Sequence, residues 1–310
     1  MRKIIHYFYN DVDIWKKGTA STFRICYKSW LQKCPDYKIM LWHDKMPEFQ
    51  KMLKQSRFLR ECYKRKMWAF VADYVRYYAL YQYGGIYLDT DVELLKNFDQ
   101  YLDKSFFCSI EGDILHGENI PEPAVMGGEA GHRIFKDVLD FYNSDEIFKM
   151  DHFITNIVMK SVLQKITSFS VIEYNQKVKE KAIKYYDTKT ELKIIDDIEV
   201  YKNQKIFRDE KYGIYIYPSE YFCPSWESFG LEAFTENTVA IHWNQSSWWK
   251  FNTSDEIKQI KSLRYGSKLK RFIFMHNKKL AKYLTLLILP KKLRKKWRNK
   301  LEYKLGNMRT

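Results

Sequence analysis

Short apolar runs alternate with longer stretches of helical periodicity along the first half of the chain. Residues 4–9 form an apolar and aromatic run, and residues 37–42 alternate in polarity, so each stretch predicts a short strand. Residues 19–32 predict a helix that ends before Pro35. Residues 46–65 predict a more polar helical region.

The clearest helical prediction covers residues 66–83, which lack glycine and proline and end at Gly84-Gly85. Residues 86–88 predict a short strand directly after these glycines. Further strands are expected at residues 106–110, 124–126 and 238–243, and a helix at residues 132–142, whereas residues 150–215 support no clear assignment. Strands that alternate with helices predict an α/β layered fold with a mostly parallel central sheet flanked by helices.

The positive charge of the chain is concentrated at one end. Residues 257–310 contain 18 lysines and arginines against one acidic residue, whereas residues 1–256 contain 35 basic and 37 acidic side chains. Because the body is nearly neutral, we expect no nucleic-acid partner. Residues 268–300 mix basic and apolar side chains, including aromatic ones, which predicts a helical tail that docks on an anionic membrane surface. The alternatives are a solvated helical tail that packs on the body and a tail with non-specific nucleic-acid affinity.

The cysteines and the hydropathy favour a cytoplasmic protein. The five cysteines lack metal-ligand spacing, and their odd number favours reduced, buried thiols. No run of about 18 apolar residues predicts a transmembrane helix. The first residues are too short and polar for a secretory leader. We therefore expect a cytoplasmic protein that is peripheral on the inner face of the membrane.

Two carboxylates, Asp89 and Asp91, follow the short apolar strand at residues 86–88. The carboxyl ends of strands are where ligands bind in open α/β sheets. Two carboxylates separated by one residue can turn towards the same Mg²⁺ or Mn²⁺ ion, which commonly bridges protein and substrate phosphates. An isolated Asp-x-Asp triplet is more often a solvated loop, so its surroundings decide the interpretation.

Those surroundings include a charged pair in an otherwise apolar helix. Asp73 and Arg76 are three residues apart, so they share one helix face and can pair. Charged side chains are costly in a buried helix unless they are paired or used. Their position shortly before Asp89 favours a functional role over a surface ion pair.

The stretch from residue 69 to residue 93 resembles the signature of glycosyltransferase family 32, the DXD-containing sugar transferases of bacterial capsules and yeast mannosyltransferases. It is more distantly similar to the glucosyltransferase domains of clostridial toxins. The resemblance extends over roughly residues 1–250 and includes residues 4–6, 34–37, 124–127, 217–219, 240–243 and 247–248. It implies a GT-A fold over 1–250, followed by the basic helical tail at 251–310. It also implies a UDP- or GDP-linked sugar donor, a Mn²⁺ or Mg²⁺ ion and transfer with retention of configuration.

The resemblance also implies roles for individual residues. Asp91 would bind the metal directly, and Asp89 would contact the ribose or the metal through water. Asp73 and Arg76 would hold the donor sugar and its phosphate. The other implied donor contacts are Tyr9, where the family usually has tryptophan, and Tyr87, Ser247 and Trp248. The glycines that usually follow position 9 in the family are Asn10 and Asp11 here.

The C-terminal part of the predicted site centres on His242. Neutral imidazole is a fair Mn²⁺ ligand, and His242 ends the strand predicted at residues 238–243. By resemblance it would complete the metal site, with Asn244 as the competing ligand. Residues 112–123 and 150–235 are expected to supply contacts to the acceptor, a glycan or lipid-linked glycan in surface polysaccharide synthesis.

The sequence pattern is also compatible with two other functions. A phosphotransferase of the haloacid-dehalogenase type also carries Asp-x-Asp after a strand, but its motif should have threonine or valine where this chain has Glu93. The second alternative is a non-catalytic nucleotide-binding protein that acts as a membrane adaptor. Release of a nucleoside diphosphate would distinguish an enzyme from the adaptor.

Overall fold

The structure is a computed structural model that describes residues 1–16, 19–111, 120–150, 153–169, 205–224 and 233–243. The chain divides into two units. The first comprises Met1–Ser144 and Ile154–Gln245, and the second comprises Asp145–Phe153 and Ser246–Thr310. The predicted tail at 251–310 lies outside the described residues. The described part of the second unit contains a short 3₁₀ helix, Glu146–Lys149, and an edge-on contact between Phe148 and Phe153.

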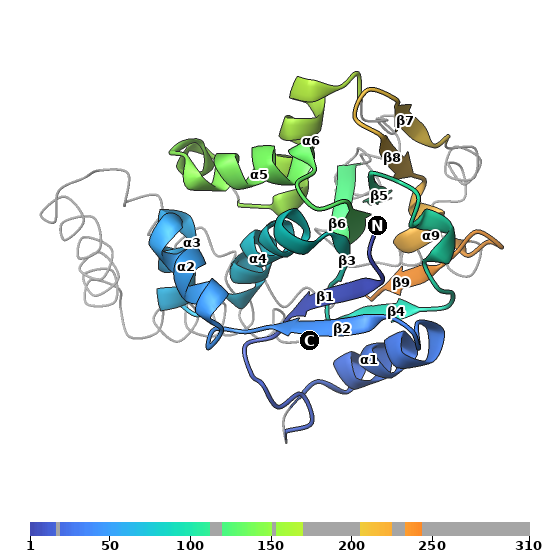
Figure 1. The fold of residues 1–310 in the computed structure, drawn as a ribbon, viewed down its shortest axis with the longest axis horizontal. Coiled ribbons are helices and arrows are strands. Elements are labelled where there is room, and N and C mark those ends of the chain that lie inside the picture. Colours follow the sequence, from blue (N-terminus) through green and yellow to red (C-terminus); the bar gives the residue numbers. More distant parts are fainter. Residues whose placement is uncertain (17–18, 112–119, 151–152, 170–204, 225–232, 244–310) are drawn as a thin grey trace, which may run out of the picture. The chain divides into compact units, whose positions relative to one another are not determined.

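The core of the first unit is a seven-stranded sheet (Figure 1). Its strands lie in the order β2 (Lys38–Trp42), β1 (Ile4–Phe8), β3 (Gly85–Leu88), β6 (Ile120–Gly128), β5 (Phe106–Glu111), β8 (Ile214–Tyr217) and β7 (Phe207–Asp209). The pairings place five strands in one direction, with β6 and the edge strand β7 reversed. The predicted α/β class is confirmed, and the mostly parallel sheet has these two exceptions.

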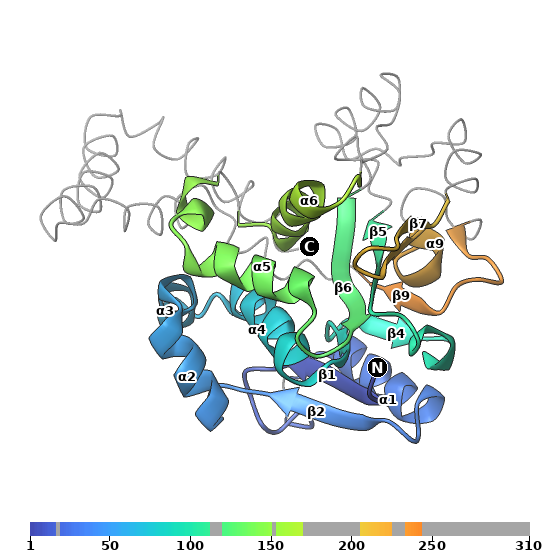
Figure 2. The same cartoon turned by 45° about the horizontal axis from the view of Figure 1, so that its top comes forward.

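Alternating side chains on β1 explain why helices lie against both faces of the sheet. Tyr7 packs against Phe23 and Trp30 of helix α1 (Ser21–Lys33). The next residue, Phe8, packs on the other face against α2 (Pro47–Gln55) and α4 (Trp68–Tyr83). Successive strand residues point to opposite faces, so one short strand contributes to two cores. Figure 2 shows α1 and α4 on either side of β1.

Helix α4 confirms the prediction for residues 66–83 to within two residues at its start. It ends at Gly84, where φ is +64°, and Gly85 follows with φ +102°. A Cβ atom on Gly85 would lie 2.6 Å from the carbonyl oxygen of Ile4, so the close approach of β3 to β1 requires glycine. The glycine pair therefore leads the chain from α4 directly into β3 and the Asp-x-Asp segment.

Several other elements match or refine the sequence predictions. The predicted helix at 46–65 is divided at Ser56 into α2 and α3 (Arg57–Lys64), and the helix at 132–142 is α5 (Arg133–Asn143). The late strand is β9 (Ala240–His242), which pairs with β4 (Val92–Leu94) in a separate two-stranded sheet. Residues 150–215 contain the unpredicted helix α6 (Thr155–Ile166), strand β7 and the start of β8. A short helix, α9 (Ser219–Phe222), follows β8.

The described helices give no sign of a membrane-spanning segment. Within the ranges given above, none combines the length and the apolar character that a bilayer crossing requires.

Candidate functional site

The Asp-x-Asp segment lies at the carboxyl end of β3, where it is fixed by backbone hydrogen bonds. The amide of Asp89 donates to the carbonyl of Ala124 on β6 at 2.9 Å, and the amide of Val92 donates to the carbonyl of Asp89 at 3.1 Å. The chain then enters β4, in which Val92 lies opposite His242 of β9. This antiparallel pairing brings His242, from a distant part of the sequence, to Asp91.

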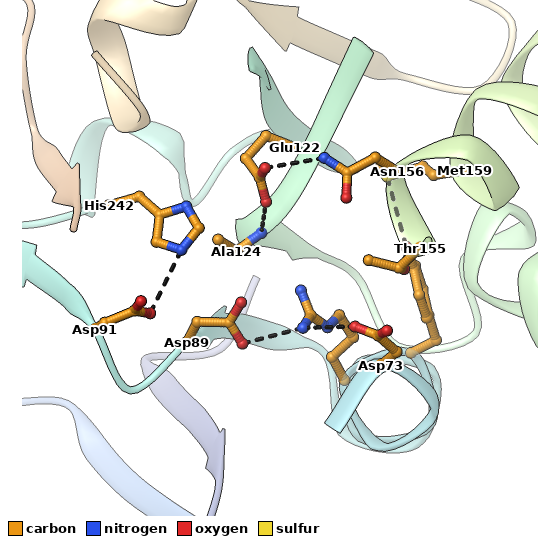
Figure 3. Close-up of polar contacts among 11 residues, drawn as sticks. Asp73, Asp89, Asp91, Glu122, Ala124, Thr155, Asn156, Met159 and His242 are labelled. Carbon is orange, nitrogen blue, oxygen red and sulfur yellow. Dashed lines mark hydrogen bonds and ion pairs between the residues drawn. The ribbon is translucent and has the colours of Figure 1, made fainter. Parts of the chain in front are cut away.

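His242 and Asp91 are in direct contact. The distance from His242 Nε2 to Asp91 Oδ1 is 3.4 Å, and the amide of Trp243 donates to the carbonyl of Asp91 at 3.0 Å. Ligand atoms of Asp89, Asp91 and His242 all lie within 4.8 Å of one another. Two carboxylates and one imidazole suit Mn²⁺ or Mg²⁺, with room for substrate phosphates as the remaining ligands. The residue types and spacing therefore fit a divalent cation (Figure 3).

Arg76 joins two of the acidic residues. Its Nη2 atom lies 2.8 Å from Asp73 Oδ1 and 3.1 Å from Asp89 Oδ1. The predicted pairing of Asp73 with Arg76 is thus present, and it is buried, since Arg76 is 4% exposed. The guanidinium lies over the ring of Tyr87 at 5.0 Å. An arginine held by two carboxylates and an aromatic ring is pre-oriented, which suits recognition of an anionic group.

Burial and charge perturb the pKa values of Asp73, Asp89 and His242. Burial raises the pKa of Asp73 to about 7 and that of Asp89 to about 6, although the positive charge of Arg76 opposes both shifts. Burial alone would lower the pKa of His242. Its contacts with Asp91 and Cys223 outweigh burial, so the pKa of His242 is raised well above its ordinary value. Perturbed groups that share a site are typical of functional centres.

Cys223, at the end of α9, contacts the other nitrogen of His242. Its Sγ atom lies 3.8 Å from His242 Nδ1. A partner on one imidazole nitrogen orients the ring and fixes which nitrogen faces a metal, here Nε2 towards Asp91. Burial raises the pKa of Cys223 to about 12, so this residue is a neutral thiol beside His242.

Comparison with known families decides the interpretation of this geometry. Residues 21–107 match the family described as "Glycosyltransferase sugar-binding region containing DXD motif". The matched stretch contains α4, β3 and both carboxylates of the Asp-x-Asp segment. This stretch of the chain is similar to the DXD-containing glycosyltransferase family.

Two curated yeast proteins are each similar to part of the chain. One is mannosyl phosphorylinositol ceramide synthase SUR1 of Saccharomyces cerevisiae, 34% identical over 127 residues, which are 36% of this chain and 30% of that protein. The other is inositol phosphoceramide mannosyltransferase 3 of Schizosaccharomyces pombe, 37% identical over 101 residues, which are 32% of this chain and 27% of that protein. The chain thus spans less than a third of either relative's length.

Solved glycosyltransferase structures superpose only in part. PaToxG glycosyltransferase gives a TM-score of 0.43 at 14% identity, covering 61% of this chain and 76% of that one. The galactosyltransferase LgtC gives 0.34 at 13% identity, covering 83% and 95%. Superpositions this loose do not bear on function.

The remaining residues predicted from the family resemblance lie in different places. Tyr9 follows β1 at the same carboxyl edge of the sheet as Asp89, and its ring packs against Phe23 with centroids 4.9 Å apart. Tyr87 is 1% exposed and contacts Arg76, so it supports that side chain from within the core. Three further predicted residues lie outside the described part of the chain: Asn244, Ser247 and Trp248.

The sequence predictions did not single out three residues near His242 and Asp89: Glu122, Asn156 and Cys223. Glu122 lies between Pro121 and Pro123 in β6, where proline cannot complete a hydrogen-bond ladder. A glutamate between two prolines in a strand indicates a bulge, and that signal was available in the sequence. Asn156 and Cys223 carry no comparable local signal.

Proposed function

We propose that this chain is a metal-dependent glycosyltransferase. It transfers a hexose with retention from a UDP- or GDP-linked donor to a glycan or lipid-linked glycan. The observation that carries this proposal is the convergence of Asp89, Asp91 and His242 beside Arg76, within a stretch that matches the DXD family. A metal site next to a buried, oriented arginine suits a nucleoside diphosphate leaving group.

Each residue has a distinct task in this proposal. Asp91, Asp89 and His242 hold Mn²⁺ or Mg²⁺, which when bound neutralises charge on the diphosphate. Arg76, held by Asp73 and Asp89, adds a second positive charge for the donor phosphate and sugar. The acceptor hydroxyl attacks from the face that the diphosphate leaves, so the reaction requires no separate pair of acid and base carboxylates.

The donor and acceptor are the finer part of the proposal. Both yeast relatives are named for mannosyl transfer or synthesis of a mannosylated inositol phosphoceramide. GDP-mannose is therefore the first donor to test, followed by UDP-linked hexoses.

A role in surface polysaccharide synthesis would supply a lipid-linked acceptor at the membrane. The basic tail would then hold the enzyme on anionic lipid, and flotation of the full chain with vesicles that contain or lack phosphatidylglycerol tests this docking.

The decisive experiment measures nucleoside diphosphate release from a panel of UDP- and GDP-linked hexoses with Mn²⁺ added. Wild type should turn over one donor, and chelation should abolish the release. Asp91→Ala should lose at least about 100-fold in turnover, because it removes a metal ligand. Asp103→Ala is the matched control, since that carboxylate is 69% exposed and pairs with Lys104 at the surface. Undiminished metal-dependent turnover by Asp91→Ala would contradict the proposal.

The same experiment addresses the two alternatives. A phosphotransferase would release inorganic phosphate from a phosphomonoester, and the family match argues against it. A non-catalytic adaptor would bind a nucleoside diphosphate with metal but release none from any donor. The pairing of Arg76 with both Asp73 and Asp89 favours an enzyme, because such a preorganised cation serves a developing negative charge.

A further inference from the structure

Glu122 is a buried carboxylate in the middle of the sheet, and the proposed mechanism gives it no task. It is 5% exposed and belongs to β6. The pairing between β5 and β6 shifts at this point, with Cys108 opposite Met126 but Ser109 opposite Glu122. Residues 123–125 are thus left out of the ladder with β5. Such irregularities redirect side chains, and they are common beside active sites.

Two neutral donors hold the Glu122 carboxylate. Oε1 accepts from the amide of Ala124 at 2.7 Å, and Oε2 accepts from Nδ2 of Asn156 at 2.9 Å. The same Nδ2 atom donates to Glu111 at 2.9 Å, so the Asn156 amide is oriented by two carboxylates. Across the described residues, no lysine or arginine forms an ion pair with Glu122.

Glu122 faces the same space as the metal-binding residues. One of its oxygens lies within 4.8 Å of ligand atoms of both Cys223 and His242. Its negative charge also contributes to the raised pKa values of Asp73 and Asp89. Figure 3 shows Glu122 opposite Asp89, between His242 and Asn156. The backbone of Ala124 connects these groups, because its carbonyl accepts from Asp89 and its amide donates to Glu122.

The charge balance of this space calls for a ligand with hydrogen-bond donors. A buried carboxylate without a cation is costly unless its remaining lone pairs are satisfied. A cation between Asp89, Asp91 and His242 would offset the charge on one side, and Arg76 offsets Asp73 and Asp89. Among the described residues, Glu122 has two neutral donors, which leave further acceptor positions on its carboxylate. Sugar hydroxyl groups supply such donors.

We propose that Glu122 is a specificity-determining residue that accepts a hydrogen bond from a ring hydroxyl of the donor sugar, and that Asn156 holds it in place. This inference rests on the proposed function and deepens it. A donor diphosphate bound to the metal would place its sugar next to Glu122 and Asn156. A sugar that lacks the correct hydroxyl would leave the Glu122 carboxylate buried with an unmet acceptor, which is a strong basis for selection.

Binding measurements separate this role from two others. The full chain is titrated with Mn²⁺ present, once with the nucleotide-sugar that wild type turns over and once with the corresponding nucleoside diphosphate. Glu122→Gln should weaken binding of the nucleotide-sugar by about 10- to 100-fold, the range for a hydrogen bond to a charged group, and leave the diphosphate affinity unchanged. Asn156→Ala should have a smaller effect of the same kind. Glu129→Gln, an exposed position just after β6, is the matched control.

Deoxy-sugar donors identify the hydroxyl. Wild type should lose affinity for one deoxy analogue, and Glu122→Gln should bind that analogue no worse than the parent donor. If Glu122→Gln weakens the diphosphate as much as the nucleotide-sugar, Glu122 acts at the metal or as a structural brace, and the proposal is overturned. Unchanged affinity for both ligands would overturn it as well. If wild type binds neither ligand with Mn²⁺, the result contradicts the proposed glycosyltransferase function itself, and with it the role of Glu122.

Discussion

The two walls of the site differ in how the chain builds them. The first wall consists of Asp73, Arg76, Asp89 and Asp91, which come from one stretch of 19 residues running through α4 and β3. The second wall is assembled from β6, α6, α9 and β9, which contribute Glu122, Asn156, Cys223 and His242. The first wall is held by a buried cation between carboxylates, and the second is held by hydrogen bonds to neutral groups.

The two walls therefore suit different parts of the ligand. The locally built wall carries the charges that suit a diphosphate and a metal. The wall assembled from distant segments carries oriented acceptors, which suit recognition of a sugar, and an imidazole that lies beside the two carboxylates of the Asp-x-Asp segment. The two walls meet where β4 pairs with β9 and places His242 against Asp91.

Removal of Arg76 should have the largest effect, because it dismantles the first wall. Arg76→Ala leaves Asp73 and Asp89 buried without their cation, so we expect a loss of about 3–5 kcal/mol in the free energy of unfolding. Turnover should fall by about 1000-fold, measured as diphosphate release. Arg76→Lys should recover only part of both, because lysine keeps the charge but lacks the planar guanidinium that lies over Tyr87.

The matched control for Arg76 is Arg133→Ala, an arginine on α5 that pairs with Asp137 at an exposed position. It should change stability by less than about 1 kcal/mol and leave turnover intact. Equal losses in the two variants would show that the first wall has no special role.

A pH series tests the burial of charge in the first wall. The folded-state pKa of Asp73, about 7, is raised above its unfolded value of 3.8. Its contribution to stability is therefore fully present below pH 3.8 and is lost as pH rises towards 7. Between pH 5 and pH 8, the free energy of unfolding of the metal-free wild type should fall by about 2 to 3 kcal/mol more than that of Asp73→Asn. Urea unfolding with a chelator present measures these free energies. The same pH dependence in both proteins would contradict a buried carboxylate at Asp73.

Substitution of Cys223 should have the smallest effect, and it tests whether this thiol orients His242 in the second wall. Cys223→Ala removes the contact with His242 Nδ1, so the imidazole is less well oriented. We expect a loss of about threefold to tenfold in Mn²⁺ affinity, below the usual range for such supporting residues because a thiol is a weak partner. Cys223→Ser should retain most of the affinity, and Cys34→Ala, another buried cysteine, should retain all of it. An equal loss in the two alanine variants would exclude a positioning role.

The same contrast explains what the sequence could predict. The first wall follows from a helix without glycine or proline, a glycine pair and a strand, which are local signals, and α4 and β3 lie where they were expected. The grouping of Asp73, Arg76 and Asp89 follows from those elements. His242 was expected at the metal only through the family resemblance, and its contact with Asp91 depends on a pairing between strands far apart in the chain.

The second wall was largely hidden because its signals are not local. Strand β6 was predicted at residues 124–126 but runs from Ile120 to Gly128, since two prolines interrupt its apolar pattern. Helix α6 was not assigned, and with it Asn156 was missed. Cys223 and Asn156 are ordinary residues in the sequence, and only the three-dimensional contacts distinguish them.

The central claim is that the two walls form one metal and diphosphate site. A double-mutant cycle on Asp91→Ala and His242→Ala tests it most directly, with Mn²⁺-dependent binding of UDP and GDP measured by calorimetry. Each single variant should lose about 10- to 100-fold in affinity, and the double variant should lose little more than the worse single variant, because both residues serve one ion. Losses that simply multiply, or full affinity in His242→Ala, would contradict a shared site.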